Sequence, residues 1–373
     1  MAGGAVSFVP PPYPYERLDG LRESASRHAG GAIDCSIGTP VDDPPAFVIE
    51  ELGRANGARG YPPSAGTARY RESAAGWMHR RFNVELMPSE LAACIGTKEF
   101  VASLARYLHL SRAERDTVLY PAVSYPTYAM GATLAGLRAV EVPMEDGVLD
   151  LSAISKDDVR RALVLWSNSP SNPTGGLDDL GAVAHWGREN GVLVASDECY
   201  ADFTWSDHPR SILEYGTENV IAVHSVSKRS NLAGVRAGFY AGDAEVVSYL
   251  RLVRQHAGLM VAAPIQSAVA LAYEDDAHVE RQRDVYFARL HVLGEALRSV
   301  GVHCPAPQGS FYLWCSREGM DGWQLGAWLA EVAGLVVSPG ELYGPAGSEF
   351  ARIAMVQPDE RIELAARRLR ESA

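Results

Sequence analysis

The feature that most constrains the fold is an alternation, from about Val118 onward, of short apolar runs with longer amphipathic stretches. Such alternation is typical of β-α-β units around a mostly parallel sheet. Each apolar run is brief and ends in turn or polar residues, which indicates a strand buried on both faces. We therefore expect an α/β fold whose chemistry lies at the carboxyl ends of its strands. The expected strands are Thr117–Tyr120, Ala162–Trp166, Val192–Ser196, Val220–His224 and Gly238–Gly242.

The pattern changes near Ala270, which predicts a second, smaller α+β domain. A long polar helix is expected over Asp275–Val300, followed by short strands at Phe311–Cys315, Leu335–Val337 and Arg352–Met355. The chain is thereby divided into an N-terminal arm with part of the small domain (1–40), a large domain (41–270) and a small C-terminal domain (271–373). Within the large domain, apolar residues at helical spacing predict a helix over Lys98–Leu110 that packs on the sheet.

Composition excludes several classes of partner. The chain carries 46 acidic and 34 basic residues, a net charge of −12, so a nucleic acid is not an expected partner. No apolar run reaches the ~18 residues of a membrane span, and Met1–Pro14 lacks the features of a signal peptide. The five cysteines are scattered, without a metal-ligand spacing. We expect a cytoplasmic protein with reduced thiols and no metal site.

Two strand ends carry polar residues suited to a ligand. The run Ser167–Gly175 contains two X-Pro bonds, which fix the backbone and can hold the amide of Asn172 toward a ligand. Turn formation alone also explains such a run. The next strand ends at Asp197, with Tyr200 three residues later. A cap on the following segment explains that carboxylate as well, but the two side chains can also contact two atoms of one heteroaromatic ring.

The lysines narrow the chemistry further, because the chain has only three: Lys98, Lys156 and Lys228. Lys156 lies in a polar stretch typical of a surface loop. Lys228 follows a buried strand, where desolvation makes a neutral amine available to attack an aldehyde. Ser225, Ser227 and Arg236 beside it suit a phosphate, as does the helix N-terminus at Thr97 and Lys98. Together these groups are the ones needed to hold pyridoxal 5′-phosphate.

In this combination the sequence resembles the aspartate aminotransferase family of pyridoxal-phosphate enzymes, fold type I, class I/II, over nearly the whole chain. The motifs that carry the resemblance are Asn172-Pro173-Thr174-Gly175, Asp197-x-x-Tyr200, Ser225-x-Ser227-Lys228 with Arg236, and Arg352. The resemblance implies a large, cofactor-binding domain with a mostly parallel sheet, a smaller α+β domain, and a homodimer with shared active sites.

The resemblance also implies roles for individual residues. Lys228 would bind the cofactor covalently and transfer the substrate proton, and Asp197 would pair with the protonated pyridine nitrogen. Tyr200 and Asn172 would hydrogen-bond the ring O3′. The other implied contacts are Thr97, Lys98, Ser225, Ser227 and Arg236 at the phosphate, Tyr125 or Tyr128 stacked on the ring, Tyr61 of the partner subunit at the phosphate, and Arg352, Asn172 and Gly38 at the substrate α-carboxylate.

Within the family, the similarity is greatest to actinobacterial N-succinyl-LL-diaminopimelate aminotransferases of lysine biosynthesis. It rests on Ser36–Val41, Gly60–Thr67, Ile95–Glu99, Asn168–Gly175, Ser196–Tyr200 and His224–Gly234. This implies ping-pong transfer of an amino group from glutamate to N-succinyl-2-amino-6-oxopimelate. Another transaminase substrate, a C–S lyase or an oxidase on the same fold is the alternative. A pyridoxal-phosphate-binding regulator would need a DNA-binding extension, which is not found. The distal acceptor groups could be bound by Arg17, Arg22 or Arg69.

Overall fold

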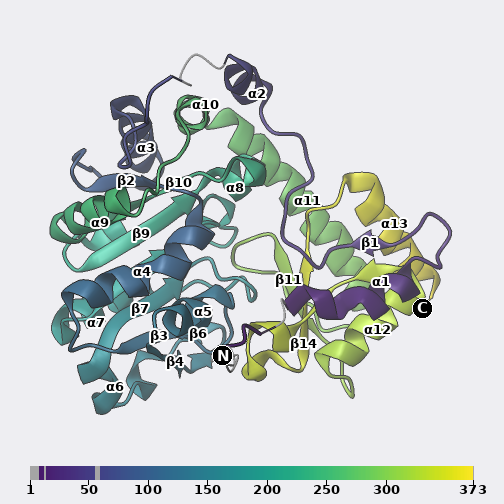
Figure 1. Ribbon diagram of the computed structural model, residues 1–373. Coiled ribbons are helices and arrows are strands. Elements are labelled where there is room, and N and C mark those ends of the chain that lie inside the picture. Colours follow the sequence, from purple (N-terminus) through teal and green to yellow (C-terminus); the bar gives the residue numbers. More distant parts are fainter. Residues whose placement is uncertain (1–7, 12–13, 55–58, 373) are drawn as a thin grey trace, which may run out of the picture.

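The computed structural model describes residues 8–11, 14–54 and 59–372. Its centre is a seven-stranded sheet in the order β2-β10-β9-β8-β7-β3-β4, seen at the left of Figure 1. The strands are β2 (Leu91–Cys94), β3 (Thr117–Pro121), β4 (Arg138–Val142), β7 (Ala162–Asn168), β8 (Leu193–Asp197), β9 (Val220–Ser225) and β10 (Gly238–Gly242). All five predicted strands are present, to within two residues at each end, and the α/β fold class is confirmed.

One strand differs from the prediction of parallel pairing. β10 pairs antiparallel with both β9 and β2, whereas β4, β3, β7, β8 and β9 are joined by parallel pairs. The connection from β9 to β10 explains the difference. It holds only the short helix α8 (Val226–Arg229) and a 3-10 turn, so the chain reverses instead of crossing over. β2 and β4 were not assigned to strands from the sequence.

Two layers of helices cover the sheet. Buried side chains of α3 (Ala68–Phe82), α7 (Leu180–Asn190) and α10 (Ala263–Glu274) pack on one face. The other face is covered by α4 (Thr97–Ser111), α5 (Thr127–Leu134) and α9 (Ala244–His256). The predicted helix Lys98–Leu110 is thus α4, and its buried face includes Val101, Leu104 and Leu108. Two shorter helices, α2 (Ala46–Gly53) and α6 (Lys156–Arg161), and the hairpin β5 (Met144–Glu145)–β6 (Val148–Leu149) complete this region.

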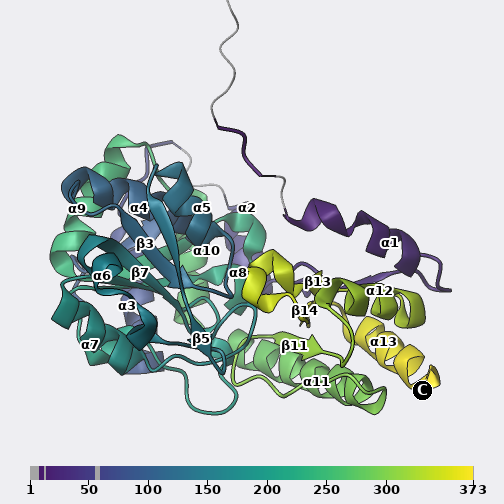
Figure 2. The ribbon, with the colours of Figure 1, turned by 90° about the horizontal axis from the view of Figure 1, so that it is seen from below.

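A second region with its own core lies beside the first, at the right of Figures 1 and 2. Its sheet has the order β11-β14-β13, and two helices contact it: α11 at β11, and α12 at β13 and β14. The N-terminal strand β1 (Ile33–Asp34) pairs with β12 (Leu335–Val336), and α1 (Asp19–Ala25) packs on α12. The remaining elements are β11 (Tyr312–Ser316), β13 (Ser338–Pro339), β14 (Phe350–Ala354), α11 (Ala277–Ser299), α12 (Gly322–Ala333) and α13 (Asp359–Glu371).

The pairing of β1 with β12 explains how residues from both ends of the chain build one region. The boundaries predicted at residues 40 and 270 stay a prediction, and the predicted arm falls largely outside the described residues. In the described ranges, no helix combines the length and the apolar character needed to cross a membrane.

Candidate active site

A cavity of about 340 Å³ opens at the carboxyl ends of β7, β8 and β9, where the large sheet faces β11 and β14 of the second region. The position is the one expected for a ligand site of an open α/β sheet. Of the residues predicted to contact the cofactor or the substrate α-carboxylate, all but Tyr61 line it: Gly38, Thr97, Lys98, Tyr125, Asn172, Asp197, Tyr200, Ser225, Ser227, Lys228, Arg236 and Arg352.

Lys228 reaches the cavity from α8, the turn of helix that follows β9. The hydroxyl of Ser225 accepts a hydrogen bond from the Ser227 backbone N–H at 3.0 Å, which caps the start of this turn. The Lys228 Nζ atom donates to the backbone carbonyl of Gly38. Burial lowers the pKa of Lys228 to about 8, and the charges of Arg352 and Arg236 act in the same direction. Near neutral pH, a far larger fraction of this amine is therefore neutral and nucleophilic than of an ordinary lysine.

Asp197 is the last residue of β8 and its side chain is buried. Its Oδ2 atom accepts from the Tyr128 hydroxyl at 3.0 Å, and its Oδ1 atom accepts from the Cys199 backbone N–H at 3.2 Å. Burial raises its pKa, and no described Lys, Arg or His side chain forms an ion pair with it. A buried carboxylate at the base of a cavity is stabilised by a cation. The protonated ring nitrogen of pyridoxal phosphate fits this need.

Tyr125 and Tyr128, the two alternatives for stacking on the cofactor ring, differ in their surroundings. Tyr128 is fully buried, stacks on Trp166 with ring centroids 5.0 Å apart, and bonds Asp197. Tyr125 is only half-buried and stands edge-on to Tyr128. The Lys98 Nζ atom lies 6.0 Å from the Tyr125 ring. Tyr125 is the better placed of the two to stack on the cofactor, because the face of Tyr128 is taken by Trp166.

Groups suited to a phosphate meet where α4 begins. Gly96 precedes the helix with φ +70°, and a Cβ atom there would overlap Nη2 of Arg236. The glycine therefore lets the guanidinium approach the N-terminus of α4, which carries a partial positive charge. The hydroxyls of Ser225 and Ser227 are 2.8 Å apart beside it. A cation, a helix N-terminus and hydroxyl donors are the groups that bind phosphate.

Arg352 comes from β14 of the second region and is buried, with 1% of its surface exposed. Its Nη1 atom donates to Oδ1 of Asn172 at 2.8 Å and Nη2 donates to the carbonyl of Ser36 at 2.5 Å. Its Nε atom is buried without a hydrogen-bond partner among the described residues, and none of their carboxylates pairs with it. A buried guanidinium without a counter-charge fits the α-carboxylate of a substrate.

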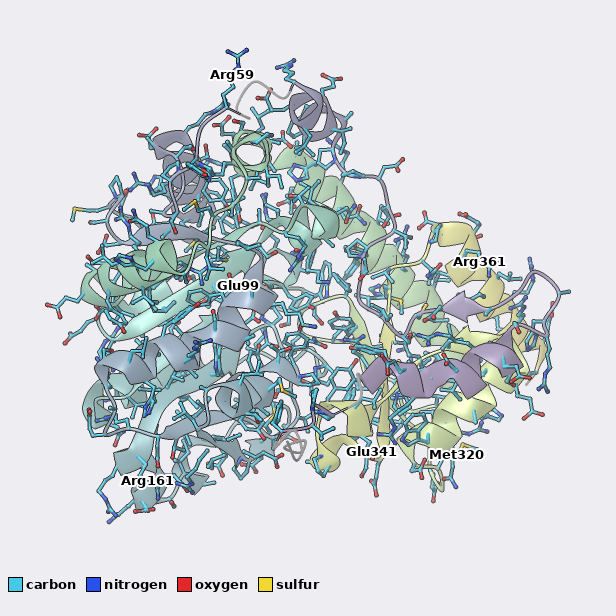
Figure 3. The ribbon with its side chains drawn as sticks, in the orientation of Figure 1. Arg59, Glu99, Arg161, Met320, Glu341 and Arg361 are labelled. Carbon is cyan, nitrogen blue, oxygen red and sulfur yellow. The ribbon has the colours of Figure 1, made fainter. Side chains whose placement is uncertain are left out.

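Four other predicted candidates lie away from the cavity. Tyr61 is 98% exposed, and Arg59 close by projects from the outer edge of the molecule (Figure 3). The contribution of Tyr61 to a partner subunit stays a prediction. The arginines considered for the distal acceptor groups are held elsewhere, each by a carboxylate: Arg17 by Glu341 at 3.4 Å, Arg22 by Asp34 at 3.1 Å and Arg69 by Glu274 at 2.9 Å.

The residues that line the cavity without a role predicted from the sequence include Tyr15, Cys199 and Tyr312. Cys199 lies between Asp197 and Tyr200, and its thiol donates to the Thr97 hydroxyl at 3.4 Å. The hydroxyl of Tyr312 is 2.7 Å from that of Tyr200. The sequence analysis gave Tyr312 no role, because its partner Tyr200 is 112 residues away in the chain and no local spacing relates the two.

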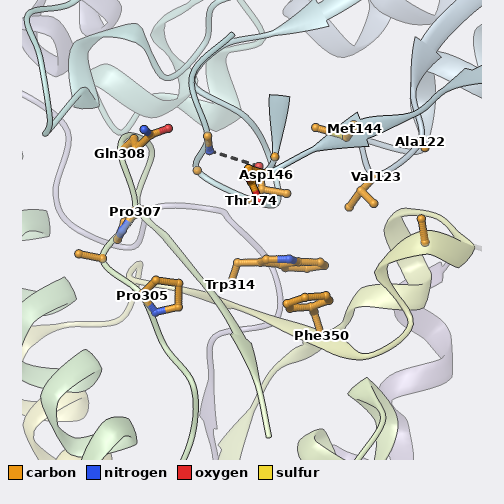
Figure 4. A pocket seen from close by; sticks show the side chains of 15 residues that line it. Ala122, Val123, Met144, Asp146, Thr174, Pro305, Pro307, Gln308, Trp314 and Phe350 are labelled. Atoms are coloured by element: carbon orange, nitrogen blue, oxygen red, sulfur yellow. Dashed lines mark hydrogen bonds between the residues drawn. The ribbon is translucent and has the colours of Figure 1, made fainter. Parts of the chain in front are cut away.

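A second cavity of about 510 Å³ lies between the two regions and is shown in Figure 4. Trp314 and Phe350 stack at its floor with ring centroids 5.1 Å apart. Among the described residues that line this cavity, Asp146 is the only ionisable one, so the cavity has no lysine or arginine from the described part of the chain. Although this cavity is larger, the nucleophile and the cations are in the smaller one, which we take as the candidate active site.

The fold and this site define a class of protein: a pyridoxal-phosphate enzyme of fold type I. Residues 32–369 match the family Aminotransferase class I and II, and the chain belongs to that family. It is a pyridoxal-phosphate-dependent aminotransferase.

Three relatives show the range of the family around this chain. A probable aminotransferase of Mycobacterium tuberculosis, Rv1178, is 42% identical over 99% of this chain and 87% of its own length. The 4-dedimethylamino-4-oxo-anhydrotetracycline transaminase OxyQ of Streptomyces rimosus is 40% identical over 96% of this chain and 99% of its own. The solved structure of a probable N-succinyldiaminopimelate aminotransferase from Thermus thermophilus has a TM-score of 0.86 and 34% identity, covering 96% of this chain and 100% of that one.

Proposed function

We propose that this cavity transfers an amino group from glutamate to N-succinyl-2-amino-6-oxopimelate in a ping-pong reaction. The observation that carries the proposal is the meeting of Lys228, Asp197 and Arg352 in one cavity. These three residues supply a half-buried amine of lowered pKa, a buried carboxylate that pairs with no described cation and a buried cation that pairs with no described carboxylate. Each supplies one of the contacts that amino-group transfer on this cofactor needs.

The bound cofactor supplies an aldehyde that takes up amino groups and a ring that accepts an electron pair. Lys228 would hold it and would accept the proton of the substrate α-carbon in its neutral form. Asp197 would keep the ring nitrogen protonated by charge pairing. Tyr200 would donate a hydrogen bond to the ring O3′, and Tyr125 would pack against the ring.

Arg352 and Asn172 orient the substrate. Asn172 is held by two bonds: its Oδ1 atom accepts from Arg352, and its backbone N–H donates to the Asn168 side chain at 2.8 Å. The guanidinium is thereby fixed before the substrate arrives, so little ordering remains for the binding step. The segment at Gly38 closes the other side of the carboxylate position.

The acceptor assignment is supported by the resemblance to N-succinyl-LL-diaminopimelate aminotransferases and by the Thermus thermophilus structure. A second candidate is a ketone acceptor of secondary metabolism, which the 40% identity to OxyQ favours. One structural observation also supports it. The cations of this chain that line the cavity are Lys98, Lys228, Arg236 and Arg352, and all four are assigned to the cofactor or the α-carboxylate. A distal carboxylate would then depend on a partner subunit.

The visible absorbance of the purified holoenzyme tests the proposal. Glutamate should bleach the cofactor band and synthetic N-succinyl-2-amino-6-oxopimelate should restore it, with Lys228→Ala as the inactive control. Restoration by a polycyclic aromatic ketone but not by this acceptor would favour the second candidate. A band that glutamate leaves unchanged refutes the glutamate reaction. Release of ammonia and pyruvate, or of hydrogen peroxide, would then identify a lyase or an oxidase.

We further propose a cytoplasmic homodimer in which Tyr61 of one subunit reaches the phosphate site of the other. Two observations support this proposal. The side chain of Tyr61 is exposed, whereas the other residues predicted to bind the phosphate line the cavity of the same chain. Mixing inactive Tyr61→Phe and Lys228→Ala chains should restore activity, because one site of each hybrid dimer has both native residues. No gain on mixing contradicts the shared site.

A further inference from the structure

We propose that Tyr312 is a positioning residue of the amino-transfer reaction. Its hydroxyl donates to the hydroxyl of Tyr200, and this bond strengthens the one that Tyr200 donates to the cofactor O3′. The inference rests on the proposed function, in which Tyr200 contacts O3′. It adds a residue that none of the predicted contacts includes.

The two hydroxyls belong to elements of different regions. Tyr312 begins β11 of the small region, and Tyr200 follows β8 of the large sheet. Their oxygens are 2.7 Å apart, their rings meet edge to face at 5.4 Å, and both side chains are buried. A bond of this length in a water-excluded site is stronger than one at the surface.

Counting protons fixes the direction of this bond when the cofactor is present. A tyrosine hydroxyl has one proton to donate. If Tyr200 gives its proton to O3′, its oxygen can only accept, so Tyr312 must donate. Burial raises the pKa of Tyr312 to about 12, which keeps that donor proton in place at working pH. Donors linked in a chain polarise one another, so the terminal bond to O3′ gains strength.

Two further contacts hold Tyr312 in place. The guanidinium of Arg352 lies 4.2 Å from the centre of its ring. On the other side, the chain passes so closely at Gly38 that a Cβ atom there would overlap the Tyr312 oxygen. The carbonyl of Gly38 in turn accepts from Lys228. Tyr312 therefore touches the groups assigned to the cofactor and to the substrate carboxylate at once.

The test is a pH titration of the cofactor's visible absorbance in the substrate-free holoenzyme. Tyr312→Phe removes only the hydroxyl. It should raise the midpoint of this titration by roughly 0.3–1 pH unit, which corresponds to the free energy of one hydrogen bond. Tyr343→Phe is the matched control, since Tyr343 is also buried against Arg352, at 4.9 Å, but its hydroxyl lies 3.2 Å from that of Tyr15. The control should leave the midpoint unchanged.

A double variant tests whether Tyr312 acts through the hydroxyl of Tyr200. In a Tyr200→Phe background, Tyr312→Phe should add no further shift, because the hydroxyl through which it acts is gone. Incorporation of 2,3,5-trifluorotyrosine at position 312 keeps the shape of the side chain and makes its hydroxyl a stronger donor, so the midpoint should fall. For glutamate, KM should stay within about twofold in Tyr312→Phe, which keeps the ring under Arg352, and should rise in Tyr312→Leu.

The outcomes distinguish a failure of the Tyr312 proposal from a failure of the proposed contact between Tyr200 and O3′. A midpoint that rises in Tyr200→Phe but stays or falls in Tyr312→Phe overturns the role of Tyr312 alone. A midpoint unchanged in Tyr200→Phe overturns the contact of Tyr200 with O3′, and the inference about Tyr312 fails with it. The fluorinated protein decides the question if Tyr312→Phe does not fold.

Discussion

The lowered pKa of Lys228 leads to a prediction that can be worked out in numbers. Burial and two nearby guanidiniums lower this pKa from 10.5 to about 8. At pH 7 the neutral fraction of the amine is then about 9%, against about 0.03% for an unperturbed lysine, a gain of roughly 300-fold. The structure thus predicts an amine whose reactivity rises tenfold per pH unit up to about pH 8 and then levels off.

The chain is well suited to the measurement because it has only three lysines. Trace labelling of the cofactor-free protein with acetic anhydride, followed by mass spectrometry, yields a titration curve for each lysine. Exposed Lys156 is the internal reference for a lysine outside the cavity. Lys228 should have its midpoint near pH 8, and Arg352→Gln should raise it, because a like charge is removed. A Lys228 curve that coincides with that of Lys156 refutes the reasoning.

Three other predictions concern the same cavity. Asp197→Asn should lower kcat by roughly 10²-fold or more, which steady-state kinetics measures. The cofactor-free variant should be at least as stable as the native protein at pH 7, because burial raises the pKa of Asp197 and its charge in the folded state becomes more costly as pH rises. Calorimetry measures this stability, and a loss of stability contradicts the argument from burial. Gly96→Ala should weaken cofactor binding at least ~10-fold, since φ +70° costs about 1–3 kcal/mol for alanine and Arg236 must move. Fluorescence titration measures this affinity, and an unchanged value would contradict the prediction. Arg352→Lys should raise KM for glutamate about 10–100-fold through loss of the planar pair of donors, and an unaltered KM would rule out this carboxylate site.

Much of the active site was predictable because its chemistry follows short motifs. Asn172, Asp197 and Lys228 each lie at or just beyond the end of one strand, and the strands β7, β8 and β9 are parallel neighbours. Parallel strands bring their carboxyl ends to one edge, so local spacing was enough to predict that these side chains meet. Arg352, from the other end of the chain, was placed by the resemblance alone.

Other features depended on contacts that no local pattern contains. The reversed direction of β10 follows from the shortness of its connection to β9, although its apolar run looks like that of a parallel strand. Arg17, Arg22 and Arg69 looked equivalent in sequence, but each is paired with a carboxylate outside the cavity. The choice between them could not be made from spacing, because it depends on which acids lie near each arginine in space.

Sequence alone was enough to predict the α/β class, the strand ends that carry the chemistry and the cofactor family, because these depend on hydrophobic period and on residues close together in the chain. Only the tertiary structure showed that the hydroxyl of Tyr312 reaches Tyr200 and that the Arg352 guanidinium lies over the Tyr312 ring. These contacts join the two regions. Their partners are set by how the regions pack, and packing is a property of the whole chain.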